Sequence, residues 1–448
     1  MKFRYNTNMK KFLIFLSIII VLGLGIFFTL SHFQINNQTK GILRFKVYPL
    51  ESIVKINNKT YQNSRGIFDI NLSSGKQKLL ISLPEYSFIE EEINIEPGKT
   101  LDLGSLFLFP NNWQEENIIN SDMIENFYLT LDSNRIVFIE KDSDYLWYLF
   151  IRNSSEKELF WKTSTLPEEV VFSLKKTMLV NLGKNNWQIV FLPKSLIQTS
   201  ISLTDAFKQA LSNSDFKTNT LSREIIQADF YSQDDNHLVI RTEDALYLLD
   251  FLDREIEKIH DGPVSPFLLE ESSVYFLKEN GVLTKASLQT KQEEQISLFS
   301  FESQDLEQTK IRKRENKQEF LIIESSKKAS YLKPPENIPV IIGENLLDAS
   351  FSLDEKEILL NLKDEIEIYN TEQEIKHATK LFTNAPAQWF LNNDYLLFQK
   401  DKTLNIFFIK ENKIWPISAN IKNDNFFYDP TINYVFYLSD KGVIKVSI

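Results

Sequence analysis

The sequence predicts a mainly β protein with an N-terminal transmembrane helix, a small β-sandwich and a C-terminal β-propeller. Three observations predict it. Residues 12–30 carry no charge, short runs that alternate apolar and polar residues begin near Gly41, and an apolar segment recurs about every 40 residues after Trp113. Because 448 residues exceed what one ordinary core fills, we expect more than one folded unit.

The first element is the predicted transmembrane helix at 12–30, between a cytoplasmic N-terminus at 1–11 and a linker at 31–41. Its sequence is FLIFLSIIIVLGLGIFFTL. At about 1.5 Å per residue this run is roughly 28 Å long, which is close to the hydrocarbon thickness of a bilayer. Basic residues precede the run and the next one is Lys40, so the later domains are expected outside the cytoplasm. A cleaved signal peptide is the alternative, although the run is long for one.

The second element is a small β-sandwich at 42–109. The run at 42–48 (ILRFKVY) alternates and stops at Pro49, and similar runs follow between turns rich in Asn, Ser, Pro and Gly. Period-two alternation bounded by such turns is typical of strands. About six short strands in this length indicate two packed sheets.

This stretch resembles the PEGA domain, a small β-sandwich of bacterial and archaeal surface proteins. Residues 48–58 (YPLESIVKINN) match the family's opening strand and its V-x-I-N segment, although only Pro49 of the eponymous tetrad is present. The later pattern is met by 72–79 (LSSGKQKL), and the closing leucine-rich strand by 101–108 (LDLGSLFL). The resemblance implies a bacterial surface protein in which this domain binds or acts as a spacer, and it implies no catalysis.

The third element is a repeat that occupies 112–448. Its clearest mark is a three-residue apolar segment that follows a polar turn, at Ile136-Val137-Phe138, Met178-Leu179-Val180, Leu238-Val239-Ile240, Val274-Tyr275-Phe276, Phe320-Leu321-Ile322, Ile358-Leu359-Leu360, Tyr395-Leu396-Leu397 and Tyr434-Val435-Phe436. Three or four short strands in each unit of about 40 residues are typical of a propeller blade. We count eight blades, with seven as the alternative.

Two further features of the repeat are expected. The last unit has room for three strands, so the segment at 117–120 is the candidate that completes it, because an unpaired edge would leave backbone groups exposed. Apolar residues at helical spacing predict a short helical insertion near 203–211, with a mobile loop as the alternative. The segment 349–360 (ASFSLDEKEILL) is similar to the turn of propellers of the Tol-Pal periplasmic type.

Composition excludes several kinds of chemistry. The chain has no cysteine, so thiolate metal sites and cysteine nucleophiles are impossible, and its 12 glycines form none of the phosphate-binding loops. His237, His260 and His377 fall in different repeat units, which leaves no histidine pair at metal-ligand spacing. Residues 111–448 carry a net charge of −16, which opposes the binding of nucleic acid because like charges repel. We therefore expect no catalytic, cofactor-binding or metal residues, and no cofactor.

These features together predict a membrane-anchored, extracytoplasmic binding or scaffold protein of the cell envelope. Its partners would be the lipid bilayer, through the N-terminal helix, and an envelope protein or polysaccharide bound by the propeller face or channel. We expect no enzymatic activity. The alternative is a propeller-fold carbohydrate-active enzyme that uses scattered carboxylates. The sequence does not identify the ligand-binding residues.

Overall fold

The computed structural model divides the chain into two compact units, Met1–Trp113 and Gln114–Ile448. The structure describes residues 21–22, 40–130, 135–141, 145–151, 157–173, 177–191, 200–214, 223–231, 236–301, 305–314, 317–363, 365–381, 383, 386–430 and 433–448.

The predicted membrane anchor is not supported. No helix among the described residues is both long enough and apolar enough to cross a bilayer. The segments predicted at 1–11, 12–30 and 31–41 lie outside the described residues, except for Val21 and Leu22, which are helical, and residues 40–41. An apolar run marks a span only where it forms a helix of about 20 residues, and hydropathy alone cannot establish that. The single-pass anchor and the extracytoplasmic localisation that depended on it are therefore corrected.

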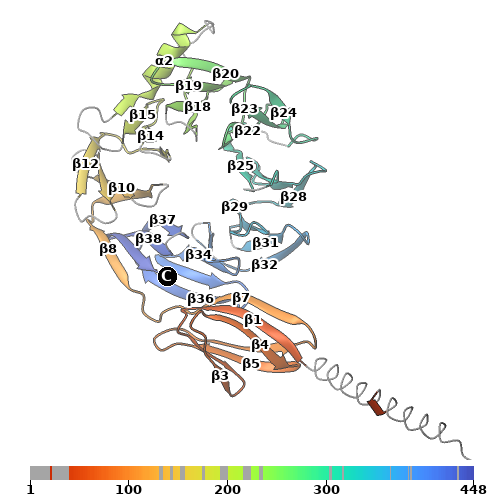
Figure 1. The fold of residues 1–448 in the computed structure, drawn as a ribbon. Helices are drawn as coiled ribbons and strands as arrows, with labels where there is room; N and C mark the ends of the chain where they lie inside the picture. The colour runs from red at the N-terminus through yellow and green to blue at the C-terminus, as the bar shows by residue number, and fades with distance from the viewer. Residues whose placement is uncertain are drawn as a thin grey trace, which may run out of the picture. The chain divides into compact units, whose positions relative to one another are not determined.

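The described residues of the first unit form two β-sheets (Figure 1). One has the order β4-β1-β7 and the other β3-β2-β5-β6. The strands are β1 (Lys40–Tyr48), β2 (Ile53–Ile56), β3 (Lys59–Tyr61), β4 (Ile67–Ser73), β5 (Gly75–Ser82), β6 (Ile89–Ile95) and β7 (Thr100–Phe107).

Alternation places one face of each sheet in a shared core. Leu43, Phe45 and Val47 of β1 are buried, and they cluster with buried residues of β2, β5 and β6 from the other sheet. The ring of Phe45 stacks on Phe68 across the β1–β4 pair, with centroids 5.0 Å apart. Burial of alternate residues is what holds two sheets of this size together.

The second unit contains eight four-stranded antiparallel sheets in its described residues. In chain order their strands are β9 (Ile124–Leu129), β10 (Arg135–Lys141), β11 (Tyr145–Ile151) and β12 (Lys157–Lys162); β13 (Glu169–Phe172), β14 (Thr177–Asn181), β15 (Trp187–Phe191) and β16 (Ser200–Ser202); β17 (Gln227–Phe230), β18 (His237–Arg241), β19 (Ala245–Asp250) and β20 (Glu255–Asp261); β21 (Leu268–Glu270), β22 (Ser273–Leu277), β23 (Leu283–Ser287) and β24 (Glu293–Gln295); β25 (Lys310–Lys313), β26 (Phe320–Ile323), β27 (Ala329–Leu332) and β28 (Pro339–Gly343); β29 (Asp348–Phe351), β30 (Glu357–Asn361), β31 (Ile366–Asn370) and β32 (Ile375–Thr379); β33 (Gln388–Phe390), β34 (Tyr395–Lys400), β35 (Thr403–Phe408) and β36 (Lys413–Ala419); and β37 (Ile421–Asp429), β38 (Tyr434–Ser439) and β39 (Gly442–Ser447), which β8 (Glu115–Asn120) completes.

These sheets follow one another around a ring, which is the arrangement of a β-propeller (Figure 1). The first strand of each sheet lies toward the centre, as β25 and β29 show, and the last strand lies at the outside, as β28 and β32 show. We call these the inner and outermost strands. Each of the eight apolar segments found in the sequence falls in the second strand of one sheet, where its residues are largely buried between neighbouring sheets.

The ring is closed by a strand from the other end of the unit. β8 pairs antiparallel with β39, which confirms the prediction that the segment at 117–120 completes the last sheet. The contact is tight at Gly442, whose φ is +120°, because a Cβ there would lie 1.8 Å from the carbonyl oxygen of Ile119. Only glycine fits such a backbone approach at that φ.

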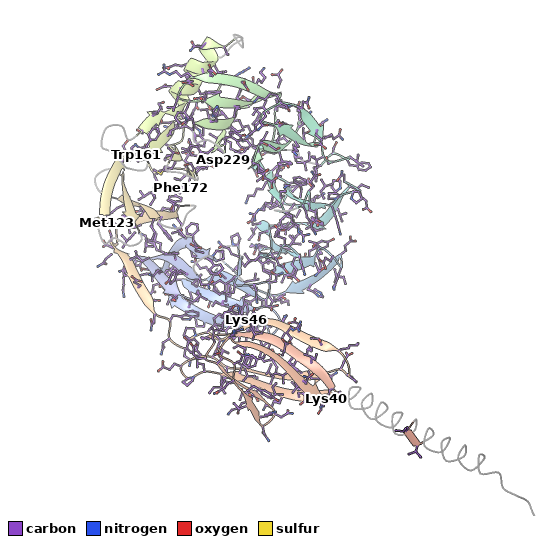
Figure 2. The ribbon with its side chains drawn as sticks, in the orientation of Figure 1. Lys40, Lys46, Met123, Trp161, Phe172 and Asp229 are labelled. Carbon is purple, nitrogen blue, oxygen red and sulfur yellow. The ribbon has the colours of Figure 1, made fainter. Side chains whose placement is uncertain are left out.

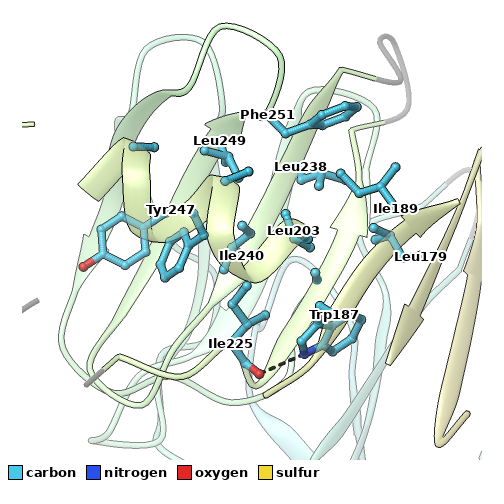
Figure 3. Close-up of a cluster of buried hydrophobic side chains, with 14 of the residues drawn as sticks. Leu179, Trp187, Ile189, Leu203, Ile225, Leu238, Ile240, Tyr247, Leu249 and Phe251 are labelled. Carbon is cyan, nitrogen blue, oxygen red and sulfur yellow. Dashed lines mark hydrogen bonds between the residues drawn. The ribbon is translucent and has the colours of Figure 1, made fainter. Parts of the chain in front are cut away.

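One helix packs against the ring. α2 (Leu203–Asn213) begins after Ser202, whose side chain accepts a hydrogen bond from the backbone N–H of Asp205 at 3.2 Å. Its apolar face, with Leu203 and Phe207, joins a core between the sheets β13–β16 and β17–β20 (Figure 3). In that core the indole N–H of Trp187 donates to the carbonyl oxygen of Ile225 at 3.0 Å.

Candidate binding site

Three inner strands repeat one four-residue pattern, and this repeat shows which polar groups the fold requires. β13, β17 and β29 read EVVF, QADF and DASF. Their last residues, Phe172, Phe230 and Phe351, pair in register with the first residue of the apolar segment on the second strand. The position before each Phe is Val, Asp or Ser. The fold therefore does not need a carboxylate there, and Asp229 is an exception.

Asp229 is half-buried on β17, and Figure 2 places it toward the centre of the ring together with Phe172. Its Oδ1 accepts a hydrogen bond of 2.7 Å from the backbone N–H of Phe230. On the inner strand β9, Asn126 makes the same bond to the N–H of Phe127 at 2.8 Å. An amide thus satisfies this local geometry as well as a carboxylate does, and the negative charge of Asp229 is not required for it.

A second carboxylate, Glu169, lies at the start of the neighbouring inner strand β13. Burial raises the pKa of Asp229 to about 6, the Phe230 N–H opposes that shift, and the negative charge of Glu169 adds to it. Burial also raises the pKa of Glu169, against the influence of Arg241. Among the described residues, neither carboxylate forms an ion pair with a cationic side chain. The two form an acidic pair that is costly to ionise, and in the described part of the chain only the charge of Arg241, acting on Glu169 without an ion pair, opposes that cost.

The arginine whose charge acts on Glu169 is already engaged by another group. Arg241, at the end of β18, is 2% exposed and holds both oxygens of Glu307, at 2.8 and 2.7 Å. Its Nη1 also donates to the carbonyl oxygen of Val264 at 3.2 Å, while its Nε finds no partner in the described structure. Glu307 belongs to the 3-10 helix η2 (Leu306–Gln308), whose N-cap Asp305 accepts its N–H.

On the other side of the ring, the inner-strand charges compensate one another. β25 and the residue after it read KIRKR. Lys313 lies 2.6 Å from Glu270 on β21, while Arg312 contacts both oxygens of Asp348 on β29, at 3.1 and 2.9 Å. The positive charges of β25 therefore join three inner strands, and they are not free for an anionic ligand.

The inner strands thus combine a charge-compensated side, at β21, β25 and β29, with an acidic pair at β13 and β17. A carboxylate pair held on rigid strands can accept hydrogen bonds from a guanidinium or an ammonium group. The arrangement fits recognition of a cationic side chain. It does not favour an anion or a nucleic acid, since both would meet the acidic pair.

The residues that sequence reasoning weighed lie elsewhere. His237 is 3.5 Å from Asp250, and Nδ1 of His260 is 2.7 Å from Oε1 of Glu293. The three histidines of the second unit lie on β18, β20 and β32, and the described residues hold no group of His, Asp and Glu side chains that could bind a metal ion.

Sequence reasoning missed Glu169, Asp229, Arg241 and Glu307. A pattern that could have found the first two is present in the sequence, because most units carry an aromatic residue before the apolar segment, and Asp229 and Glu169 stand one and three positions before Phe230 and Phe172. Aligning β13, β17 and β29 on that aromatic shows an acid at Asp229 where the other two strands carry Val171 and Ser350. No local pattern relates Arg241 to Glu307.

No family model matches the chain, and no curated protein matches it either, so the resemblance of 42–109 to the PEGA domain is not supported by a family model. Solved structures match it at low identity. Sqt1 of Saccharomyces cerevisiae is 12% identical with a TM-score of 0.49 over 75% of this chain and 98% of that one. The Dos1 propeller is 12% identical (TM-score 0.48, 75% and 95%), and BamB of Moraxella catarrhalis is 8% identical (TM-score 0.47, 75% and 98%). The propeller assignment rests on the strand order described above.

Proposed function

We propose that this protein is a non-catalytic binding or scaffold protein, in which an eight-bladed propeller with one four-stranded sheet per blade binds a protein ligand through a basic side chain. The observation that carries the proposal is the pair Glu169 and Asp229. The charges of the inner strands β21, β25 and β29 are compensated by ion pairs, whereas Glu169 and Asp229 form none among the described residues. Gln227 and Val171 show that an uncharged residue suffices at each of their repeat positions.

The chemistry of the pair selects the ligand. A buried carboxylate that no cation compensates lowers stability, and such a group is retained where a ligand supplies the missing charge. An arginine or lysine side chain would supply it and would also form charge-assisted hydrogen bonds. A neutral polysaccharide would leave the charge uncompensated, so we favour a protein ligand over a polysaccharide.

Titration calorimetry of the full chain with a tetra-arginine peptide tests this proposal. We expect binding at pH 7.5, weakened at least about tenfold in Asp229→Asn, which corresponds to about 1.4 kcal/mol. Asp253→Asn is the matched control, since it removes the same charge from an exposed turn of the same sheet. The proposal fails if the peptide does not bind, or if both variants weaken it equally through net charge alone.

One observation favours the alternative of a carbohydrate-active enzyme. Two carboxylates with raised pKa values on neighbouring strands are the groups that such an enzyme would use as acid and base. A panel of chromogenic glycosides discriminates the two functions. Turnover that both Glu169→Gln and Asp229→Asn abolish would establish the enzyme and overturn the binding role.

A further inference from the structure

Most of the described outermost strands of the ring carry charged side chains or are covered by a helix, either of which opposes pairing of their open edges with other chains, and one described strand has neither. Of the eight described outermost strands, six contain charged side chains: β8 (EENIIN), β12 (KELFWK), β20 (EIEKIHD), β24 (EEQ), β32 (IKHAT) and β36 (KIWPISA). Charge on an edge strand opposes association of edges. The uncharged β16 (SIS) is contacted by the helix α2.

β28, with the sequence PVIIG, has neither charge nor a covering helix among the described elements. Its side chains Val340 and Ile341 are 53% and 55% exposed, and Ile338 just before it is 46% exposed. A register shift next to Ile341 interrupts the pairing of β28 with β27. Large apolar side chains are exposed on this edge strand, and no described strand pairs with its outer side.

A loop of the preceding sheet extends this apolar surface. Leu298 and Phe299 are 63% and 57% exposed, and the N–H of Leu298 donates to the carbonyl oxygen of Asn337 at 3.0 Å, one residue before Ile338. The loop is fixed on both sides, since Phe301 donates its N–H to Gly281 at 2.9 Å. We call Leu298, Phe299, Ile338, Val340 and Ile341 the apolar edge. Its loop is held in place before any partner arrives.

We propose that the apolar edge is a homodimer interface, in which β28 of two copies pair antiparallel about a two-fold axis. The charge pattern selects a second copy as the occupant. In a two-fold contact each strand meets itself, so a charged outermost strand would place like charges opposite one another. β28 meets itself without such a pair, in a chain whose net charge of −11 makes other self-contacts unfavourable.

The size of the apolar edge sets the strength of the dimer. Five large side chains, each about half exposed, supply on the order of 400 Å² per copy, about half of the roughly 800 Å² per partner in a standard interface. We expect a reversible dimer that forms at micromolar concentration. Added salt should strengthen it, because salt screens the repulsion between two acidic chains.

Sedimentation velocity of the full chain tests the proposal. The wild type should dimerise between about 1 and 100 µM, and Val340→Lys or Ile341→Lys should weaken the dimer at least about tenfold. Ile375→Lys is the matched control, because Ile375 is a 48% exposed apolar residue on the next outermost strand, β32. A wild type that stays monomeric overturns the proposal, as does a dimer that Ile375→Lys weakens as much as the β28 variants do.

The absence of cysteine allows a second, independent test. Paired antiparallel strands bring opposite Cα atoms to about 4.5–5.5 Å, within the range that a disulfide spans. With diamide as oxidant, Val340→Cys, Ile341→Cys or an equal mixture of the two should form a crosslinked dimer, and Ile375→Cys should not. If Ile375→Cys crosslinks as fast as the β28 variants, or none of these crosslinks, the pairing of β28 is excluded.

Discussion

Arg241 holds both carboxylate oxygens of Glu307 although 66 residues separate them along the chain. The sheet β21–β24 lies between them in sequence, so this contact fastens the segment before β25 to the sheet β17–β20. The two side chains are buried very unequally, at 3% and 50% exposed. This difference in burial determines which of the two side chains can be substituted with the smaller loss of stability.

Glu307→Gln should destabilise the second unit more than Arg241→Met does. Removing the carboxylate leaves a buried guanidinium without its charge partner, which we expect to cost about 2–4 kcal/mol. Removing the arginine leaves a half-exposed carboxylate that water solvates, at a cost of about 1 kcal/mol. Urea unfolding followed by tryptophan fluorescence measures both values, and equal losses would contradict the account of the pair.

Asp229→Asn should stabilise the protein at pH 7.5 and not at pH 4. The folded pKa of about 6 lies above the ordinary 3.8, so the folded state binds more protons between these values, and stability falls as the pH rises through that window. Two pKa units would give about 3 kcal/mol for a fully buried group, and half-burial reduces the expected gain to about 1–2 kcal/mol. Thermal melting at both pH values checks the sign, and a loss of stability at pH 7.5 would show that the charge is favourable.

Gly442→Ala should open the closure of the ring. The added Cβ would meet the carbonyl oxygen of Ile119, and pairing between β8 and β39 would be lost at a cost of about 2–4 kcal/mol. Hydrogen exchange should show faster exchange in β8. Gly262→Ala is the control: its φ is also +120°, but its Cβ would meet nothing closer than 3.6 Å. Equal effects of the two variants would mean that φ, rather than the close approach, sets the cost.

Trp187→Phe should cost about 2–3 kcal/mol, because it removes buried volume and leaves the carbonyl oxygen of Ile225 without its hydrogen bond. Trp415→Phe, at a half-buried position on β36, should cost less than about 1 kcal/mol. Chemical unfolding compares the two. Similar losses would place the helix α2 and its core outside the cooperative unit.

Much of the fold was predictable because burial leaves a local pattern. The segments from Ile136 to Phe436 are apolar at every position since the second strand of each sheet is buried on both faces. The same reasoning found the closing strand, since an eighth unit with three strands needs a fourth. The predicted membrane span is not supported, because no helix among the described residues is long and apolar enough to cross a bilayer, and nearly all of 12–30 lies outside those residues.

The candidate site was not predictable to the same degree. Asp229, Val171 and Ser350 occupy equivalent positions in three inner strands. This equivalence is visible only when the repeats are aligned strand by strand, and that alignment requires the strand register. Arg241 lies on β18 and Glu307 lies before β25, and no sequence periodicity predicts a contact between these two positions. The apolar edge at β28 was hidden because exposed and buried apolar residues look alike in a sequence.

The pH dependence of tetra-arginine binding tests the central claim most directly. Asp229 loses its proton near pH 6, so the affinity of the full chain measured by calorimetry should rise from pH 5 to 7.5, and Asp229→Asn should flatten this profile while Asp253→Asn preserves it. An affinity that does not change with pH, or a profile that is the same in Asp229→Asn, would contradict the assignment of the inner-strand carboxylates as the binding site.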